Sequence, residues 1–255
     1  WLKVWRRHGR CAPVAMTTGW DSVQTVALSN GIELRITPEK QMPAAEASPV
    51  AEHWTGNAIW ESAQVLAKLL SAEPARVQGQ RVLELGTGCG LSGLAAGALG
   101  AREVTLTDDV VFMAAHNLES NFADRPELRS RFRVQQLRWG DAAQIAEARP
   151  PFDVVLGTDL LYNSEYHDAL AQTVLAVSAP GTTVLFASPD GSPDEEGSFS
   201  HRFYQRLAAQ GFEVRDISRR RVVVKALGPW GVWGMYGRGP VRVVEMRMGG
   251  GASRL

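Results

Sequence analysis

The feature that most constrains the fold of this chain is a regular alternation of short apolar runs and helical patterns between residues 81 and 187. The expected strands are Arg81–Leu85, Glu103–Thr107, Phe132–Gln136, Phe152–Leu156 and Thr182–Ala187. Helical patterns separate several of them, at Leu91–Leu99, Val110–Asn121 and Ser164–Val177. Strands that alternate with helices in this way form a parallel sheet that helices cover on both faces. The sequence therefore predicts a Rossmann-like, doubly wound α/β fold.

The last quarter of the chain follows a different pattern. A helix is expected at Ser198–Ala209, followed by strands at Phe212–Lys225 and Val241–Met248 with only a loop between them. Two strands that are joined without a helix suit an antiparallel pair, because a parallel pair needs a long crossover. We therefore expect a seven-stranded sheet that is mostly parallel, with an antiparallel last strand.

The N-terminal part of the chain is expected to hold a β-hairpin and a helix. Val23–Leu28 and Ile32–Thr37 flank Asn30-Gly31, a dipeptide that favours a tight turn with positive φ. Apolar positions at i, i+3, i+4 and i+7 predict a helix over Trp60–Ala72. We expect a flexible extension followed by a single domain made of a hairpin, a linker and a Rossmann-like core, at residues 1–22, 23–37, 38–55 and 56–255.

Charge and cysteine content argue against several classes of function. The 27 basic residues are balanced by 27 acidic ones, which disfavours general affinity for nucleic acid or an anionic membrane. No run of about 18 apolar residues is present. Cys11 and Cys89 cannot form a disulfide framework, which favours a reducing compartment. The histidines show no metal-ligand spacing, so no metal site is expected.

A glycine-rich turn joins the first strand of the core to the next helix. Gly86, Gly88 and Gly90 lie where glycines let the backbone approach a ligand and where a helix N-terminus offers free N–H groups. Asp108 ends the following strand, 22 residues after Gly86, which suits a carboxylate that binds a ribose diol. A dinucleotide enzyme would share both features, and close packing of strand on helix would explain the glycines alone.

The spacing of the glycines favours another cofactor. A dinucleotide fingerprint requires G-x-G-x-x-G, whereas Glu84-x-Gly86-x-Gly88-x-Gly90 resembles the first motif of S-adenosylmethionine-dependent methyltransferases. Ile59–Ala63, Leu137–Asp141 and Gly157–Tyr162 extend the resemblance to the protein-lysine methyltransferases of methyltransferase family 16. Members of that family modify chaperones, translation elongation factors and similar abundant proteins, and one branch methylates histidine. The resemblance covers about residues 56–177.

The resemblance implies a role for each matching residue. Trp60 lines the cofactor pocket, Asp108 binds the ribose hydroxyls, and Trp139 packs against adenine. The implied cofactor-binding residues are Trp60, Glu84, Gly86, Thr87, Gly88, Asp108, Trp139 and Thr158. Asp159 and Tyr162 form a D-x-x-Y signature near the acceptor and are the implied catalytic residues. The cofactor would be S-adenosyl-L-methionine and the partner a substrate protein, methylated at a lysine.

Alternatives to these roles stay open. Trp139 would also suit a core, Tyr162 would also pack at the start of a helix, and Asp159 would also interact with a helix N-terminus. The acceptor could be a protein histidine, a small molecule or a nucleic acid, and the chain could be an inactive cofactor-binding partner protein. Leu160 and Leu161 argue against nucleic acid, since amino-methylating enzymes of that class carry two prolines there.

The loop at residues 227–240 carries large side chains among glycines and prolines: Trp230, Trp233, Met235 and Tyr236. Aromatic anchors on a glycine-rich segment suit protein recognition, so we interpret this loop as a substrate lip. An apolar loop beneath the sheet is the alternative. We further expect the protein to be monomeric and cytoplasmic.

Overall fold

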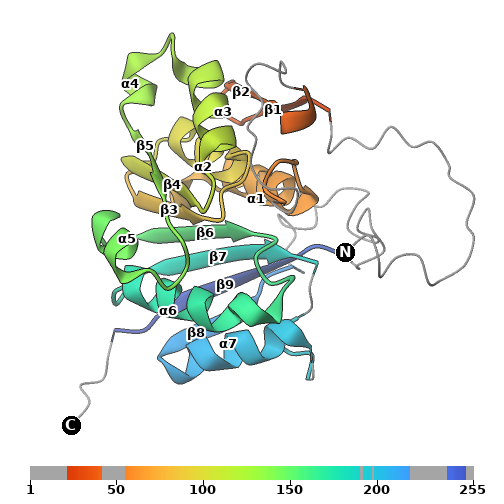
Figure 1. Cartoon of the computed structure of the whole chain (residues 1–255), viewed down its shortest axis with the longest axis vertical. Coiled ribbons are helices and arrows are strands. Elements are labelled where there is room, and N and C mark those ends of the chain that lie inside the picture. Colours follow the sequence, from red (N-terminus) through yellow and green to blue (C-terminus); the bar gives the residue numbers. More distant parts are fainter. Residues whose placement is uncertain (1–21, 42–54, 190–191, 197, 219–239, 251–255) are drawn as a thin grey trace, which may run out of the picture.

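A seven-stranded sheet forms the centre of the protein, with strand order β5-β4-β3-β6-β7-β9-β8 (Figure 1). It is seen in a computed structural model that describes residues 22–41, 55–189, 192–196, 198–218 and 240–250. The strands are β3 (Arg81–Leu85), β4 (Glu103–Asp108), β5 (Phe132–Gln136), β6 (Val154–Thr158), β7 (Thr183–Ser188), β8 (Phe212–Asp216) and β9 (Arg242–Met248). Pairings among β3 to β7 are parallel, whereas β9 runs antiparallel to both β7 and β8. The predicted fold class, with its antiparallel last strand, is confirmed.

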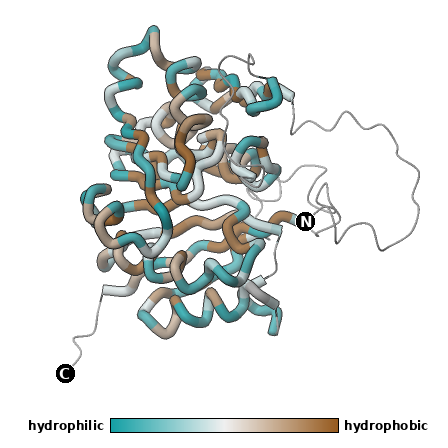
Figure 2. Tube along the Cα trace, in the orientation of Figure 1, coloured by the Kyte–Doolittle hydropathy of each residue, from teal (hydrophilic) through white to brown (hydrophobic). Residues whose placement is uncertain are grey.

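Helices cover both faces of this sheet. One buried apolar cluster contains α1 (Glu61–Ala72), α2 (Leu91–Ala98) and α3 (Phe112–Phe122), and the other contains α5 (Ala142–Glu147), α6 (His167–Val177) and α7 (Phe199–Ala209). In β7, Leu185 and Ala187 belong to the first cluster, whereas Val184 and Phe186 belong to the second. This alternation is the period of two that a strand imposes on its side chains. Because helices cover both faces, both sets of side chains are apolar, which gives the central strands their hydrophobic colour in Figure 2.

The predicted N-terminal hairpin is present and packs on the first face. β1 (Gln24–Ala27) and β2 (Glu33–Ile36) pair antiparallel. Gly31 has the positive φ of 82° that the turn requires, while Asn30 is not among the residues with positive φ. The Asn30 side chain instead donates a hydrogen bond to the carbonyl of Ala98, at 2.7 Å. The dipeptide therefore both closes the turn and attaches it to α2.

Two asparagines of α3 attach the hairpin to the core. Asn117 is fully buried, accepts a hydrogen bond from the Thr37 N–H at 2.8 Å and donates to the Thr37 carbonyl at 3.1 Å. Its amide also donates to the carbonyl of Cys89 at 3.0 Å. Asn121 makes the same paired contact with the backbone of Arg35. Because Cys89 belongs to the glycine-rich turn, the hairpin is linked to that turn through one side chain.

Some observed bounds differ from the predicted ones. The helix expected at Ser164–Val177 begins as a 3-10 helix, η5 (Ser164–Tyr166), before α6. Sequence analysis missed α5, because a helix this short shows little periodicity and only its N-cap, Asp141, marks its start. The strand expected at Phe212–Lys225 ends at Asp216. Further short helices are η3 (Glu39–Gln41), η4 (Pro74–Arg76) and α4 (Pro126–Arg129).

Several expectations concern segments outside the described residues. They are the N-terminal extension up to residue 21, residues 42–54 of the linker, and residues 219–239, which include Trp230, Trp233, Met235 and Tyr236. Within the part that the structure describes, none of the helices has both the length and the apolar character needed to cross a bilayer.

Candidate active site

The strand order locates the edge at which a ligand is expected. From β3 the chain proceeds outward through β4 to β5, and then returns beside β3 with β6 and proceeds in the other direction. Open α/β sheets bind ligands at the carboxyl ends of their strands, next to such a change of direction. The segments that follow β3, β4, β5 and β6 meet at this edge, and they contain most of the predicted site residues.

The glycine-rich turn after β3 has no room for side chains. Gly86, Gly88 and Gly90 have φ values of 59°, 51° and 87°. A Cβ on Gly86 would lie 2.5 Å from Leu160 Cδ2, and one on Gly88 would lie 3.0 Å from the carbonyl oxygen of Gly56. Conformation favours glycine at all three positions, and lack of space also requires it at Gly86 and Gly88. Sequence analysis did not identify Leu160 and Gly56, whose contacts with the turn arise only in the folded chain.

Glu84 lies beneath the turn and holds it from inside. Its side chain is 1% exposed and accepts hydrogen bonds from the Thr87 hydroxyl and from the Gly93 N–H, the latter at 3.0 Å. Burial raises the pKa of this carboxyl to about 7, although the bonds from Thr87 and Gly93 favour the charged form. Of the predicted cofactor-binding residues, Glu84 and Thr87 thus direct their side chains into the protein and shape the turn.

Asp108 connects the turn to the end of β4. Its Oδ2 atom accepts a hydrogen bond from the Gly88 N–H at 2.9 Å, and its Oδ1 atom accepts a longer one from the Val110 N–H at 3.4 Å. The side chain is partly exposed at the carboxyl edge. A carboxylate can accept about four hydrogen bonds, which makes this side chain chemically suited to the hydroxyls of a ribose.

Trp139 lies across the same edge, after β5. A Cβ on Gly86 would be 3.4 Å from Trp139 Cζ2, which places the indole next to the turn. The backbone of this segment is fixed by α5 and α6, because the Gly140 N–H donates to Thr173 Oγ1 at 2.8 Å and the Asp141 side chain caps α5. Trp139 is half-buried, with one part packed on the second apolar cluster.

Trp60 is the N-cap residue of α1, and the residues before it lie against the glycine turn. Its indole N–H donates to the Thr55 carbonyl at 2.9 Å, and Gly56 packs on Gly88. Cys89 follows in the turn, with its thiol 3.5 Å from the Gly56 carbonyl oxygen. Burial raises the pKa of this thiol to about 12, so it stays protonated and is no nucleophile.

Thr158 and Asp159 leave β6 next to the turn. Leu85 pairs with Gly157 in the register of β3 and β6, so the residues that follow them leave the sheet side by side. Asp159 has a left-handed φ of 55°, and its N–H donates to the Ala187 carbonyl at 2.9 Å. The carboxylate of Asp159 is not the cap of the next helix, since the Asn163 side chain accepts the N–H of Glu165 and caps η5.

Tyr162 is half-buried between Leu161 and η5. Leu160 and Leu161 beside it are buried, which leaves Asp159 and Tyr162 as the polar side chains of the D-x-x-Y signature. The carbonyl of Leu161 lies 3.1 Å from the Nε2 atom of the buried His167, and this contact holds the segment on α6.

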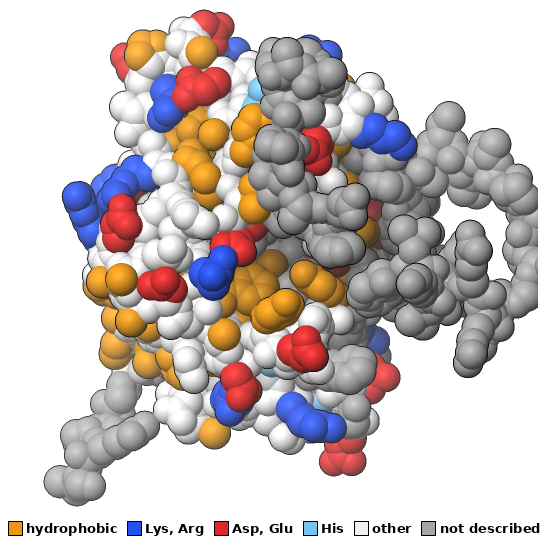
Figure 3. Space-filling model, viewed as in Figure 1, with side chains coloured by type: hydrophobic (Ala, Val, Ile, Leu, Met, Phe, Trp, Pro, Cys, Tyr) orange, Lys and Arg blue, Asp and Glu red, His pale blue; other side chains and the backbone are white. Residues whose placement is uncertain are grey.

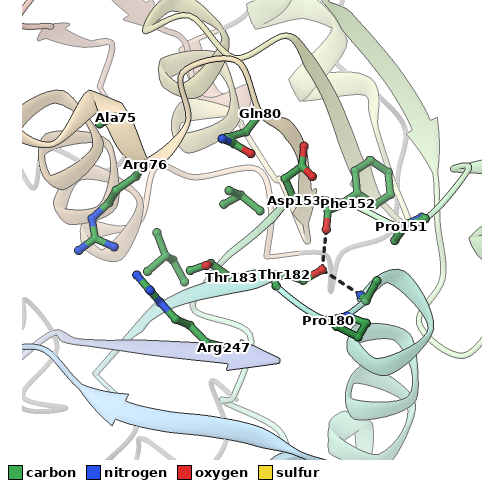
Figure 4. Close-up of a pocket in the computed structure, with 14 residues that line it drawn as sticks. Ala75, Arg76, Gln80, Pro151, Phe152, Asp153, Pro180, Thr182, Thr183 and Arg247 are labelled. Carbon is green, nitrogen blue, oxygen red and sulfur yellow. Dashed lines mark hydrogen bonds between the residues drawn. The ribbon is translucent and has the colours of Figure 1, made fainter. Parts of the chain in front are cut away.

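A cavity of about 490 Å³ lies at the other edge of the sheet (Figure 4). Its lining comes from the segments before β3, β6 and β7 and from the end of β9, and includes Arg76, Gln80, Asp153 and Arg247. Arg76 pairs with Glu73 and with the buried Glu245, and Arg247 also pairs with Glu245, so two carboxylates balance the two guanidinium groups there. This cavity holds none of the predicted site residues. Among the described residues, no group of three or more metal-ligating side chains is found either.

The geometry of the carboxyl edge fits S-adenosyl-L-methionine. A turn with three glycines, a carboxylate at the end of β4 and a tryptophan after β5 surround one place, and none of these residues requires a pyrophosphate or a metal. Comparison with known proteins agrees. The family described as lysine methyltransferase matches residues 47–205, more than half of the chain.

Individual relatives and one solved structure extend this comparison. The chain is 34% identical to the protein N-lysine methyltransferase METTL21A of Danio rerio, over 65% of this chain and 74% of that protein. It is also 34% identical to the calmodulin-lysine N-methyltransferase of Arabidopsis thaliana, over 67% of this chain and 58% of that protein. The fold resembles the O-methyltransferase of Bacillus cereus in complex with S-adenosylhomocysteine, at a TM-score of 0.50 and 20% identity over 80% and 84% of the two chains. The chain therefore belongs to the lysine methyltransferase family, whose cofactor is S-adenosyl-L-methionine.

Proposed function

We propose that this protein methylates the side-chain amine of a lysine in another protein, with Asp159 and Tyr162 at the acceptor. The observation that carries the proposal is the position of Asp159, which leaves β6 beside the glycine turn in a left-handed conformation. Aspartate tolerates this conformation better than most residues, and non-glycine residues held in it are concentrated at functional sites. The names of the two relatives above favour lysine as the acceptor.

The main chemical task of these residues is to prepare the amine. Bound S-adenosylmethionine supplies an electrophilic methyl group on its sulfonium sulfur. An unperturbed lysine has a pKa of about 10.4, so its neutral form costs about 4 kcal/mol at cellular pH. We propose that Asp159 receives the proton, directly or through water, while the Tyr162 hydroxyl orients the amine. Once that proton has passed on to solvent, the Asp159 carboxylate also stabilises the positive charge that develops on nitrogen as the methyl group arrives.

Nucleic acid is the less favoured acceptor. Leu160 and Leu161 occupy the positions of two prolines in the nucleic-acid enzymes, and both leucines are buried. Figure 3 shows acidic and basic side chains interspersed over the viewed face, as the neutral net charge suggests. A nucleic-acid enzyme would be expected to have a basic stripe. A protein histidine or a small molecule is distinguished by the acceptor experiment below.

The roles of Asp159 and Tyr162 are tested by separating turnover from cofactor affinity. Asp159→Ala and Tyr162→Phe are expected to lower the single-turnover rate by roughly 10- to 1,000-fold. The dissociation constant for S-adenosylhomocysteine and the melting temperature should change little. Turnover that falls only in proportion to lost folded protein would assign both residues a packing role.

For the cofactor, we propose that Asp108 binds the ribose hydroxyls and that Trp139 contacts adenine, with Trp60 and Thr158 bordering the pocket. Asp108→Ala should weaken binding by about 1.5–3 kcal/mol, the range for a charged hydrogen-bonding group. Calorimetry with S-adenosylhomocysteine measures this. Asp108→Asn is the matched control, because it retains an acceptor for the Gly88 N–H; equal affinity of wild type and Asp108→Ala would move the ribose site elsewhere.

The acceptor itself is found by labelling. Incubation of a cell extract with the enzyme and radiolabelled cofactor, followed by mass spectrometry of the labelled band, should locate the methyl group on a lysine. The control is the same extract incubated with the Asp159→Ala variant in place of the wild-type enzyme. Label on histidine, nucleic acid or a small molecule would correct the acceptor, and a protein that binds the cofactor but transfers no label would favour the inactive partner.

We also propose a monomer that works in the cytoplasm. Among the described residues, the exposed large hydrophobic side chain is Tyr166, so that part of the surface offers no broad apolar interface. The buried free thiol of Cys89 suits a reducing compartment. Light scattering should give the mass of one chain, and a fluorescent fusion should distribute through the cytoplasm.

A further inference from the structure

Tyr166 is an unusual residue at the carboxyl edge. Its side chain is 49% exposed, whereas the other large hydrophobic side chains that the structure describes are buried or half-buried. It ends η5, and its backbone N–H donates to the Asn163 carbonyl at 3.3 Å. His167, the next residue, is 7% exposed and is held by the Leu161 carbonyl and by Phe203. The Tyr166 ring is therefore presented from a fixed backbone.

The ring of Tyr166 contacts one residue of the cofactor site. Its centroid lies 6.3 Å from that of Trp139, with the two planes at 74°. This is the edge-to-face arrangement that aromatic pairs prefer. Trp139 in turn lies against Gly86, while its own backbone is fixed by the bond from Gly140 to Thr173. The indole thus has a fixed base, the glycine turn at its edge, and Tyr166 as its neighbour from the acceptor segment.

We propose that Tyr166 is a positioning residue for the cofactor, which holds the Trp139 indole in the orientation that adenine requires. The proposal rests on the placement of adenine against Trp139 given above. Without Tyr166 the half-buried indole would gain rotational freedom, and this freedom would be lost again on binding. Ordering the Trp139 indole on binding would then cost free energy and weaken the affinity for the cofactor. The same contact joins the acceptor segment between β6 and α6 to the cofactor side of the site.

Calorimetry with S-adenosylhomocysteine tests this role. Tyr166→Ala should weaken binding by about two- to tenfold, the equivalent of one aromatic pair. Tyr166→Phe keeps the ring and should bind within about twofold of wild type. Glu165→Ala removes an exposed side chain from the same turn and serves as the matched control. The cofactor-free Tyr166→Ala variant should lose no more stability than one aromatic pair contributes, about 0.5–1.5 kcal/mol, so it stays folded in the affinity measurement.

A double-mutant cycle with Trp139 decides whether Tyr166 acts through it. Trp139→Ala alone should weaken binding, and adding Tyr166→Ala should then change the dissociation constant no further. If the effects of the two substitutions on the dissociation constant multiplied in the double mutant, the proposal would be overturned. Wild-type affinity in Tyr166→Ala would also overturn it. An increase in the KM for the protein substrate at unchanged cofactor affinity would instead assign Tyr166 to the acceptor, and would also overturn it. If Trp139→Ala bound S-adenosylhomocysteine with wild-type affinity, adenine would not contact Trp139. The positioning role of Tyr166 would then be wrong as well.

Discussion

At the scale of single residues, Glu84 shows how a buried carboxylate can serve a ligand site without facing the ligand. Its Oε2 atom accepts hydrogen bonds from the Thr87 hydroxyl and the Gly93 N–H, on the two sides of the glycine turn. A Cβ on Gly93 would lie 2.6 Å from Glu84 Oε2, so glycine is also needed on the helix side. Leu106 Cδ2 would lie still closer to that Cβ, so Glu84 and Leu106 together require glycine at position 93.

Glu84 makes stability dependent on pH. Burial raises its pKa in the folded state from 4.5 to about 7, so between these values the folded form binds more protons than the unfolded form. Stability must then fall as pH rises through this range, and fall no further above it. The free energy of unfolding from urea titrations should drop by up to about 3 kcal/mol relative to Glu84→Gln, which stays neutral. A difference between wild type and Glu84→Gln that is the same at every pH would contradict this.

At the scale of elements, the hairpin is attached to the site by helix α3. Leu34 and Ile36 of β2 are fully buried in the first apolar cluster, so the hairpin belongs to the core of the domain. The polar part of the contact depends on Asn117, which joins Thr37 to Cys89. The sequence signal for this contact was the spacing of Asn117 and Asn121, because residues four apart in a helix lie on one face.

Replacement of Asn117 should destabilise the protein more than that of Asn121. Asn117→Ala leaves the part-buried backbone groups of Thr37 and the buried carbonyl of Cys89 without this partner, at a cost of about 2–4 kcal/mol. Asn121→Ala removes bonds from a more exposed site and should cost about 1 kcal/mol. Urea unfolding measures both. If the two variants lost similar free energies of unfolding, the buried hydrogen bonds of Asn117 would contribute no more to stability than the exposed ones of Asn121.

At the scale of the whole molecule, the site brings together segments that follow four strands. A cofactor that binds only when these segments are assembled stabilises the folded state by mass action. S-adenosylhomocysteine at about 100 times its dissociation constant should add about 2.7 kcal/mol, which raises the melting temperature by about 5–10 °C in a chain of this size. NAD at the same concentration should leave the temperature unchanged, and a shift with NAD alone would restore the dinucleotide hypothesis.

The sequence by itself determined the class of fold and the chemistry of the edge. Alternation of strands and helices predicts the parallel sheet, because apolar periodicity is a local property of each segment. The motif from Glu84 to Gly90 predicts the cofactor through its resemblance to the first motif of S-adenosylmethionine-dependent methyltransferases, and the positive φ of its glycines is a local property of the turn. The roles of Asp108, Trp139, Asp159 and Tyr162 stay predictions, and the structure brings the segments that carry them to one edge.

Only the tertiary structure decided how distant segments meet. The insertion of β9 between β7 and β8, the packing of Leu160 and Gly56 on the turn, and the contact of Tyr166 with Trp139 join residues far apart in the chain. The inward direction of Glu84 likewise depends on α2 packing against β3. Such contacts leave no local pattern, because each depends on the simultaneous position of two elements. Local periodicity and motif spacing describe one segment at a time, and so they predict the elements and leave their contacts to the folded chain.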